Sequence, residues 1–338
     1  MEKRSFGVLS NGQEASLYTI CCGKLEAAVT DFGATLVSLW VPDQNGAVAD
    51  VVLGFEDANA YAASDTFLGA TVGRNANRIG GAAFCLGETK YALEKNDNGN
   101  NLHSGSDSYA FRIWDVQAYT DSSITFAINS PDGDQGFPGN AEIRVTYTLE
   151  HPATLRITYD GICDADTVFN MTNHSYFNLA GHDHPELAMA QTLSMGASVY
   201  TVADAESIPT GELRPVAGTP MDFRTPKPIG RDIDEDYEAL NLQGGYDHNF
   251  EAFGDCCAVL TDPASGRVMQ VQTDCPGVQV YAGNYLNGEI GKNGAVYTRR
   301  GGICLETQYY PDAINHPQWK QPVYKAGERY HSETQFIF

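Results

Sequence analysis

Hydrophobic and polar residues alternate along many short segments of this chain. Gly, Pro, Asp and Asn interrupt these runs. Alternation with a period of two predicts half-buried antiparallel strands, because successive side chains of a strand point to opposite faces. The clearest segments are S-L-Y-T-I-C-C (16–22), T-L-V-S-L-W-V (35–41), E-I-R-V-T-Y-T-L-E (142–150), T-L-R-I-T-Y-D (154–160), V-M-Q-V-Q-T (268–273), V-Q-V-Y-A-G (278–283) and H-S-E-T-Q-F-I-F (331–338).

Segments with the period of a helix are few and short, and they lie near 56–62 and 234–240. Runs of turn-forming residues are too short to be interdomain linkers. We find no internal repeat and no change in composition that marks a domain boundary. The pattern therefore predicts an all-β protein, a large antiparallel β-sandwich built as a single domain over residues 1–338.

Composition is consistent with a globular protein that has an ample core. Of the 338 residues, 42% are hydrophobic, and 18 Tyr and 15 Phe add large apolar side chains. A core of this size needs neither disulfides nor metals for stability. The eight cysteines show no C-x-x-C spacing, and the N-terminus has no apolar segment of a secretion signal. We expect reduced thiols in a cytoplasmic protein.

The chain is strongly acidic, with 43 Asp and Glu against 21 Lys and Arg and a formal net charge of -22. Such a field repels phosphate backbones and anionic lipid surfaces. We therefore expect no nucleic-acid partner and no membrane partner. A neutral or cationic small ligand is favoured, although an acidic surface also serves solubility alone.

One histidine and one glutamate stand out as candidates for proton transfer. His174 lies in T-N-H-S-Y-F-N (172–178), where neighbouring side chains offer hydrogen-bond donors and acceptors. Glu306 lies in I-C-L-E-T-Q-Y-Y-P (303–311), far downstream on another predicted strand. Together they could act as acid and base on one hydroxylated substrate.

Other polar candidates have weaker support from the residues alone. His103 follows a flexible Asn/Gly run, and strand periodicity points Asp247 and His248 to opposite sides of their segment. Arg78, in G-R-N-A-N-R-I-G-G (73–81), could donate to sugar or carboxylate oxygens or form an internal salt bridge. The H-x-H of G-H-D-H-P (181–185) lacks a third ligand, so we expect a turn there and no metal site.

Six motifs, taken together and in order, resemble the aldose 1-epimerase (galactose mutarotase) family. They span about residues 50 to 320, which is nearly the whole chain. The resemblance implies a galactose mutarotase-like supersandwich with a sugar cleft, and an isomerase that interconverts α and β anomers of free aldoses such as galactose and glucose without a cofactor. The motifs are G-R-N-A-N-R-I, N-L-H-S-G, T-N-H-S-Y-F-N-L-A-G, G-Y-D-H-N-F, P-G-V-Q-V-Y-A-G-N and L-E-T-Q-Y-Y-P-D-A-I-N-H-P.

The resemblance also implies roles for individual residues. Glu306 matches the family's general base and His174 its general acid. Two departures are visible: Ser104 stands where the family usually has Gly after L-H, and Asn75 stands in a slot that is commonly apolar or aromatic. The residues that match sugar-binding positions are His103, Asp247, Arg78, Asn77 and Gln279.

Ring opening of a pyranose requires loss of the anomeric hydroxyl proton and delivery of a proton to the ring oxygen, so one base and one acid suffice. We expect an adjacent carboxylate to raise the pKa of His174 and keep it protonated.

Three alternative functions stay open on the sequence. A glycoside hydrolase would use Glu306 and Asp247 as its carboxylate pair. A carbohydrate-binding module could occupy the same fold without catalysis. A mutarotase for phosphorylated hexoses is disfavoured by the acidic charge and by the lack of extra Arg or Lys near the motifs.

Overall fold

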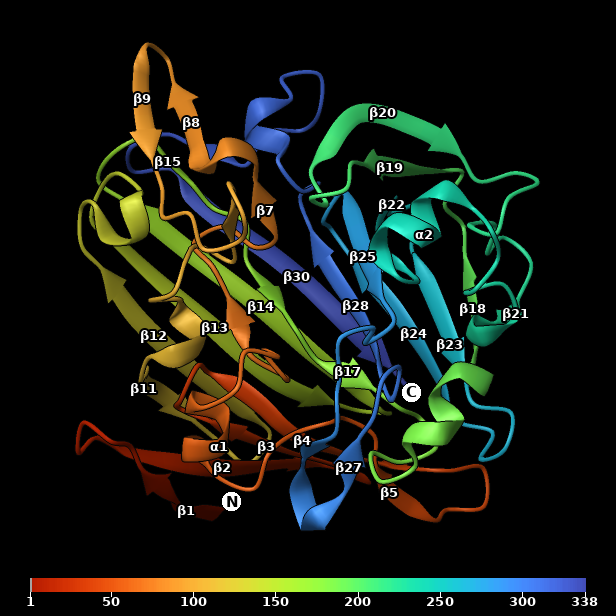
Figure 1. Cartoon of the computed structure of the whole chain (residues 1–338). Helices are drawn as coiled ribbons and strands as arrows, with labels where there is room; N and C mark the ends of the chain where they lie inside the picture. The colour runs from red at the N-terminus through yellow and green to blue at the C-terminus, as the bar shows by residue number, and fades with distance from the viewer. Residues whose placement is uncertain (1) are drawn as a thin grey trace.

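Strands make up most of the regular structure in the computed structural model, which describes residues 2–338 (Figure 1). Within this part of the chain, the pairings between named strands are antiparallel and form three larger sheets. The largest sheet has nine strands and runs through the centre of the molecule. In spatial order it contains β11 (Asp115–Tyr119), β12 (Ser123–Ser130), β13 (Ala141–Glu150), β14 (Thr154–Cys163), β30 (Arg329–Ile337), β24 (Val268–Thr273), β23 (Ala258–Thr261), β18 (Thr192–Met195) and β21 (Lys227–Pro228).

A second sheet of six strands, counted within residues 2–338, carries much of the candidate site. Its order is β17 (Tyr176–Phe177), β28 (Ile303–Gln308), β25 (Gly277–Tyr281), β22 (Asp247–Glu251), β19 (Val199–Ala203) and β20 (Pro209–Pro215). The N-terminal sheet, drawn in red at the bottom of Figure 1, contains β1 (Glu2–Val8), β2 (Glu14–Cys22), β3 (Leu25–Thr30), β4 (Thr35–Pro42) and β5 (Val48–Asp50).

Five short two-stranded pairs of the described chain lie outside these three sheets. The described residues contain β7 (Arg78–Ile79) with β10 (Asn101–Leu102), β6 (Thr71–Val72) with β16 (Thr172–Asn173), β8 (Ala83–Leu86) with β9 (Thr89–Ala92), β15 (Thr167–Val168) with β29 (Val323–Tyr324), and β26 (Glu289–Ile290) with β27 (Val296–Tyr297).

The two α-helices of the described chain are short. The helix expected near 56–62 is confirmed as α1 (Ala58–Ala62), and the Asp57 carboxylate accepts a hydrogen bond from the Ala60 N–H at 3.0 Å. The helix expected near 234–240 begins later, as α2 (Glu238–Gln243), because the backbone of Tyr237 is still extended. None of the helices in residues 2–338 combines the length and hydrophobicity that a membrane-spanning helix needs.

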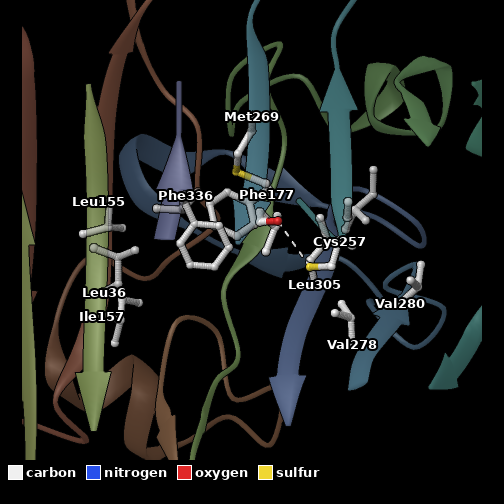
Figure 2. Close-up of a cluster of buried hydrophobic side chains, with 14 of the residues drawn as sticks. Leu36, Leu155, Ile157, Phe177, Cys257, Met269, Val278, Val280, Leu305 and Phe336 are labelled. Carbon is white, nitrogen blue, oxygen red and sulfur yellow. Dashed lines mark hydrogen bonds between the residues drawn. The ribbon is translucent and has the colours of Figure 1, made fainter. Parts of the chain in front are cut away.

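The strand alternation seen in the sequence is the alternation of burial in the structure. In β13, residues 141, 143, 145, 147 and 149 are buried and the residues between them are more exposed. The main core joins the nine-stranded sheet to both the six-stranded sheet and the N-terminal sheet. Figure 2 shows Leu305 of β28 and Val278 and Val280 of β25 in one buried cluster with Phe336 and Met269 of the larger sheet. The expected all-β antiparallel sandwich is confirmed.

Both faces of β28 are covered, since all six of its residues are buried. Leu305 belongs to the main core, so Glu306, the next residue, projects from the opposite face of the sheet. Gln279 of β25 is the direct cross-strand partner of Glu306, and Asn249 of β22 is the partner of Gln279. The hydrophobic alternation of these strands thus places a row of polar side chains on the face away from the core.

Candidate active site

A cavity of about 260 Å³ opens over this polar face. Six of the seven site residues expected from the sequence line it; the seventh, Gln279, is not among the described lining residues. The lining residues are Asp65, Thr66, Phe67, Asn77, Arg78, Leu102, His103, His174, Tyr176, Asp247, Tyr281, Tyr285, Leu286 and Glu306.

His174 and Glu306 meet in this cavity although they are far apart in the chain. His174 directly follows β16, and its backbone N–H donates to the Ala70 carbonyl at 2.9 Å. Its Nε2 atom lies 3.7 Å from Glu306 Oε2. Both side chains are buried, and within residues 2–338 Glu306 Oε2 has no hydrogen-bond partner. A buried polar atom of this kind is a natural contact for a ligand.

Burial shifts the pKa values of this pair in opposite directions. Loss of hydration raises the pKa of Glu306 well above its usual range, and the nearby charge of Asp247 raises it further. Loss of hydration lowers the pKa of His174 to about 4. Our expectation that the adjacent carboxylate raises the pKa of His174 is therefore wrong, because burial dominates the shift and Glu306, whose own pKa is raised, carries no negative charge that would stabilise an imidazolium.

His103 and Asn77 are tied together at the rim of the cavity. The His103 N–H donates to the Asn77 carbonyl at 3.1 Å, and the Asn77 N–H donates to His103 Nδ1 at 3.2 Å. A ring nitrogen that accepts a hydrogen bond carries no proton, so neutral His103 carries its proton on Nε2. Burial and the neighbouring His174 lower the pKa of His103 well below its usual range. His103 is thus a neutral imidazole whose Nε2–H is its hydrogen-bond donor.

The two arginines of G-R-N-A-N-R-I serve different purposes. Arg78 lines the cavity, and its Nε donates to Asp97 Oδ2 at 2.7 Å. Arg78 therefore both lines the cavity and forms an internal salt bridge, the two alternatives that the sequence left open. Arg74 is fully buried away from the cavity lining, and it donates to the Pro138 carbonyl at 2.8 Å and to Thr167 Oγ1 at 3.0 Å.

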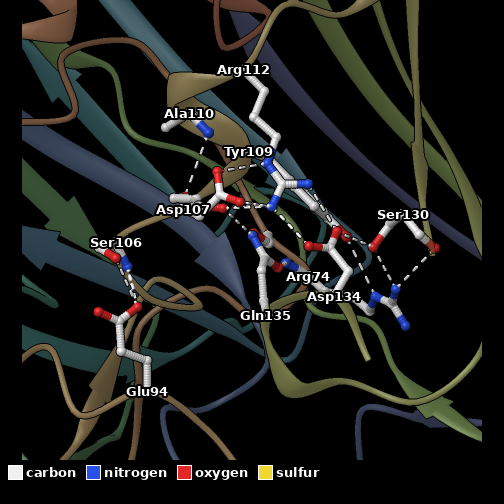
Figure 3. Close-up of polar contacts among 12 residues, drawn as sticks. Arg74, Glu94, Ser106, Asp107, Tyr109, Ala110, Arg112, Ser130, Asp134 and Gln135 are labelled. Carbon is white, nitrogen blue, oxygen red and sulfur yellow. Dashed lines mark hydrogen bonds and ion pairs between the residues drawn. The ribbon is translucent and has the colours of Figure 1, made fainter. Parts of the chain in front are cut away.

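Arg74 also contacts Ser130, whose hydroxyl donates to Asp134, and Asp134 pairs with Arg112 (Figure 3). This buried network anchors the start of the segment that carries Asn77 and Arg78.

Asp247 reaches the cavity from β22, and Gln279 supports it from β25. Gln279 Nε2 donates to Asp247 Oδ1 at 2.7 Å. Burial raises the pKa of Asp247 above its usual value. His248 faces the other side of β22 and packs against Tyr200 at a ring-centroid distance of 5.8 Å, so the prediction that Asp247 and His248 do not share a site is confirmed.

Aromatic side chains form a wall that our sequence analysis missed. Phe67 packs against His103 and His174, with ring-centroid distances of 4.8 and 6.1 Å. Tyr176 stacks on His174 at 5.2 Å, and Tyr281 packs edge-on against it at 6.2 Å. Tyr176 and Tyr281 lie inside the motifs quoted above, two residues after His174 and Gln279. This spacing could have identified both tyrosines as residues of the site. Phe67 lies in no such motif.

His182 and His184 flank a turn, as expected, and neither lines the cavity. Instead, a group that could hold a metal ion lies at the site itself. It consists of His174, Cys304 and Glu306, with one potential ligand atom from each residue within 4.8 Å of the others. The position of Cys304 in the sequence offers no sign of such a group, because spacing rules for metal sites do not cover residues brought together from separate strands.

Comparisons with known proteins agree with this geometry. The family model for aldose 1-epimerase matches residues 16–336. The chain is 39% identical to mouse galactose mutarotase over 98% of this chain and 97% of that protein. It is 41% identical to the aldose 1-epimerase of Haemophilus influenzae over 91% of each chain. The chain belongs to the aldose 1-epimerase family.

Solved structures of related proteins share the whole fold of this aldose 1-epimerase family member. A crystal structure of an aldose epimerase homologue from C. elegans superimposes with a TM-score of 0.89 at 29% identity, covering 96% of this chain and 98% of that one. A galactose 1-epimerase from Lactobacillus acidophilus superimposes with a TM-score of 0.86 at 26% identity, covering 99% and 97%. The resemblance noted from the six motifs is thereby confirmed.

Proposed function

We propose that this protein is an aldose 1-epimerase that interconverts the α and β anomers of free hexoses such as galactose and glucose. The observation that carries this proposal is the buried pair of His174 Nε2 and Glu306 Oε2, 3.7 Å apart in a cavity lined with hydroxyl-binding groups. One cavity thus offers a proton donor and a proton acceptor side by side. Names of the relatives, galactose mutarotase and aldose 1-epimerase, support the same reaction.

The reaction needs two coupled proton transfers. The resting pair holds its one proton on Glu306, so this proton first passes to His174, which makes Glu306 the base and His174 the acid. Glu306 then removes the proton from the anomeric hydroxyl while His174 gives a proton to the ring oxygen, and the bond between the anomeric carbon and the ring oxygen breaks to leave an open-chain aldehyde. Rotation of the aldehyde and the reverse transfers close the ring on the other face. Each proton returns to the group that supplied it, so the reaction consumes no cofactor.

The remaining polar residues are proposed to bind the sugar hydroxyls. His103 Nε2–H and the Arg78 guanidinium are donors, the Asp247 carboxylate is an acceptor, and Asn77 offers both kinds of group. Gln279 is proposed to act through Asp247, to which it donates at 2.7 Å. The apolar faces of Phe67 and the tyrosines suit the C–H faces of a pyranose.

The cavity disfavours two of the alternatives. A glycoside hydrolase that uses Glu306 and Asp247 gives no task to His174, which directly faces Glu306. The described lining residues include three acids, Asp65, Asp247 and Glu306, and a single arginine. This balance of charge disfavours a phosphorylated hexose.

A cytoplasmic location is also part of the proposal. It is supported by the cysteines, all of which carry free thiols.

Polarimetry on freshly dissolved α-galactose and α-glucose tests the function. We expect the purified protein to accelerate equilibration and EDTA to leave the rate undiminished. A folded protein that accelerates neither sugar, nor any other common aldose, would refute the proposal. A thermal shift with sugar but no rate enhancement would favour a binding module, and release of free sugar from a glycoside would favour a hydrolase.

A further inference from the structure

Cys304 is a buried thiol next to the proposed acid and base. It lies two residues before Glu306 on β28, so both side chains project from the same face of the strand. Its Sγ atom is 3.6 Å from His174 Nδ1, while His174 Nε2 is 3.7 Å from Glu306 Oε2. The three residues therefore bring a thiol, an imidazole and a carboxylate into contact in one buried cluster.

These are the ligand types of tetrahedral zinc sites. Bonds of about 2.0–2.3 Å to nitrogen, oxygen and sulfur place neighbouring ligand atoms roughly 3.3–3.8 Å apart in a tetrahedron. The Cys304–His174 and His174–Glu306 contacts, 3.6 and 3.7 Å, fall in this range. Cys304 contacts Nδ1 of His174, whereas Glu306 contacts Nε2. One ion can bind only one of these ring nitrogens. A small rotation of the His174 ring or of a neighbouring side chain is therefore needed to bring the three ligand atoms, which lie within 4.8 Å of one another, around a single ion.

Two further observations favour an ion at this cluster. Glu306 Oε2 is buried, faces His174, and has no hydrogen-bond partner within residues 2–338. The cavity of about 260 Å³, which His174 and Glu306 line, leaves space for a water molecule as fourth ligand and for entry of an ion. Asp247 on the same cavity and the net charge of -22 both attract a divalent cation.

We propose that His174, Cys304 and Glu306 bind one soft divalent cation of the zinc or cadmium type, which occupies the sugar cavity and reversibly blocks it. As the metal binds, the thiol proton and the one proton held by the His174–Glu306 pair both pass to solvent. The inhibitory part rests on the proposed mutarotase function, whereas binding of the ion does not. The cation is an inhibitor in this proposal, so it is consistent with a reaction that EDTA leaves undiminished.

Cadmium titration of the full-length, EDTA-treated and desalted protein tests the site directly. Cadmium bound to a thiolate absorbs in the ultraviolet, so we expect one equivalent of Cd²⁺ to produce this band. Cys304→Ser preserves the size of the side chain but removes the soft ligand, and Cys304→Ala removes the ligand altogether. Both should abolish the band and weaken Cd²⁺ and Zn²⁺ binding by at least roughly 10-fold.

Cys163→Ala is the matched control, because Cys163 is also buried but its Sγ contacts the Pro138 carbonyl. This variant should titrate like the wild type. A band that persists in both Cys304 variants would overturn the proposal and place the metal at another thiol, for instance at the exposed Cys21 beside Glu26.

Competition with sugar tests the inhibitory part. Galactose should weaken the apparent affinity of the protein for Zn²⁺. In turn, Zn²⁺ should raise the apparent Michaelis constant for the sugar. The rate of each variant with Zn²⁺ is compared with the rate of the same variant without metal. Stoichiometric binding with no effect of galactose would overturn the block of the cavity. The cadmium band needs no enzyme activity, so the metal site can be confirmed or refuted even if the protein proves not to be a mutarotase.

Discussion

The Ser104 hydroxyl is hydrogen-bonded to both backbone polar groups of Asn75, accepting from the N–H at 2.9 Å and donating to the carbonyl at 3.0 Å. These are the two residues at which the chain departs from the family pattern. Ser104 has φ 68°, a left-handed conformation that explains why glycine is usual there. The serine accepts the strain of this conformation and links the segments that carry Asn77 and His103.

This link predicts an order of stability among variants of Ser104. Ser104→Ala keeps the left-handed strain and leaves the buried Asn75 N–H without its partner, which should cost about 1–3 kcal/mol. Ser104→Gly loses the same bonds but relieves the strain, so it should be less destabilised than Ser104→Ala. Urea unfolding measures the order, and an alanine variant as stable as the wild type would refute the importance of the link. Both variants should also raise the Michaelis constant, because Asn77 and His103 lose their support.

The proposed acid and base predict large losses of turnover. Glu306→Gln cannot accept a proton, and His174→Asn cannot donate one as an imidazolium does. Each should lower turnover by at least roughly 10²-fold. The double variant should lose far less than the product of the single losses, because the two residues act in one cycle. Glu251→Gln, outside the cavity lining, is the control, and a Glu306→Gln enzyme within a few-fold of wild type would rule out Glu306 as the base.

The shifted pKa values predict the shape of the pH profile. At neutral pH the pair holds one proton, since the pKa of Glu306 is raised and that of His174 is lowered to about 4. Acid adds a second proton, on His174, and removes the base; alkali removes the last proton, from Glu306, and removes the acid. The rate should therefore fall on both sides of a broad plateau, with the acid limb well below the ordinary histidine pKa of about 6.5.

The assignment of the limbs is the reverse of the one expected from ordinary pKa values, in which glutamate sets the acid limb and histidine the alkaline limb. Measuring kcat/KM against pH tests it. An acid limb centred near the ordinary histidine value would contradict the lowered pKa of His174.

Asp247 should affect both sugar binding and the alkaline limb. Asp247→Ala should mainly raise the Michaelis constant, because the carboxylate is proposed to hold a hydroxyl away from the reacting bond. Asp247→Asn keeps the shape but removes a charge that raises the pKa of Glu306, so its alkaline limb should move to lower pH. Gln279→Ala is the matched comparison: it removes the support of Asp247 but not the charge. An unchanged alkaline limb in Asp247→Asn would show that the two carboxylates do not interact.

Arg74 and Arg78 form a matched pair four residues apart. Arg74→Ala leaves several buried hydrogen-bond acceptors without a partner and should reduce the free energy of unfolding by at least about 2 kcal/mol. Arg78→Ala should leave stability nearly unchanged and raise the Michaelis constant. Urea unfolding and steady-state kinetics on both variants separate these effects. A loss of turnover at saturating sugar in Arg78→Ala, with an unchanged Michaelis constant, would refute its binding role.

The local pattern of the sequence determined the class of secondary structure and most of the polar residues of the site. Period-two alternation is a property of neighbouring residues, so strands such as β13 and β14 could be located without knowledge of their partners. The motifs identified His174, Glu306 and four further residues that line the cavity. Leu305 faces the core, and alternation along the strand directs the next side chain, Glu306, to the polar face. The single domain over residues 1–338 stays a prediction.

Only the tertiary structure decided which groups meet and how strongly water is excluded from them. Three features of the site join segments that are distant in the chain. They are the contact of Cys304 with His174, the aromatic wall of Phe67 and Tyr281, and the hydrogen bond by which Gln279 supports Asp247. The pKa order of His174 and Glu306 likewise depends on burial, which is the sum of contributions from many separate strands and loops. Local patterns cannot encode that sum, because hydration at one atom is set by every segment packed around it.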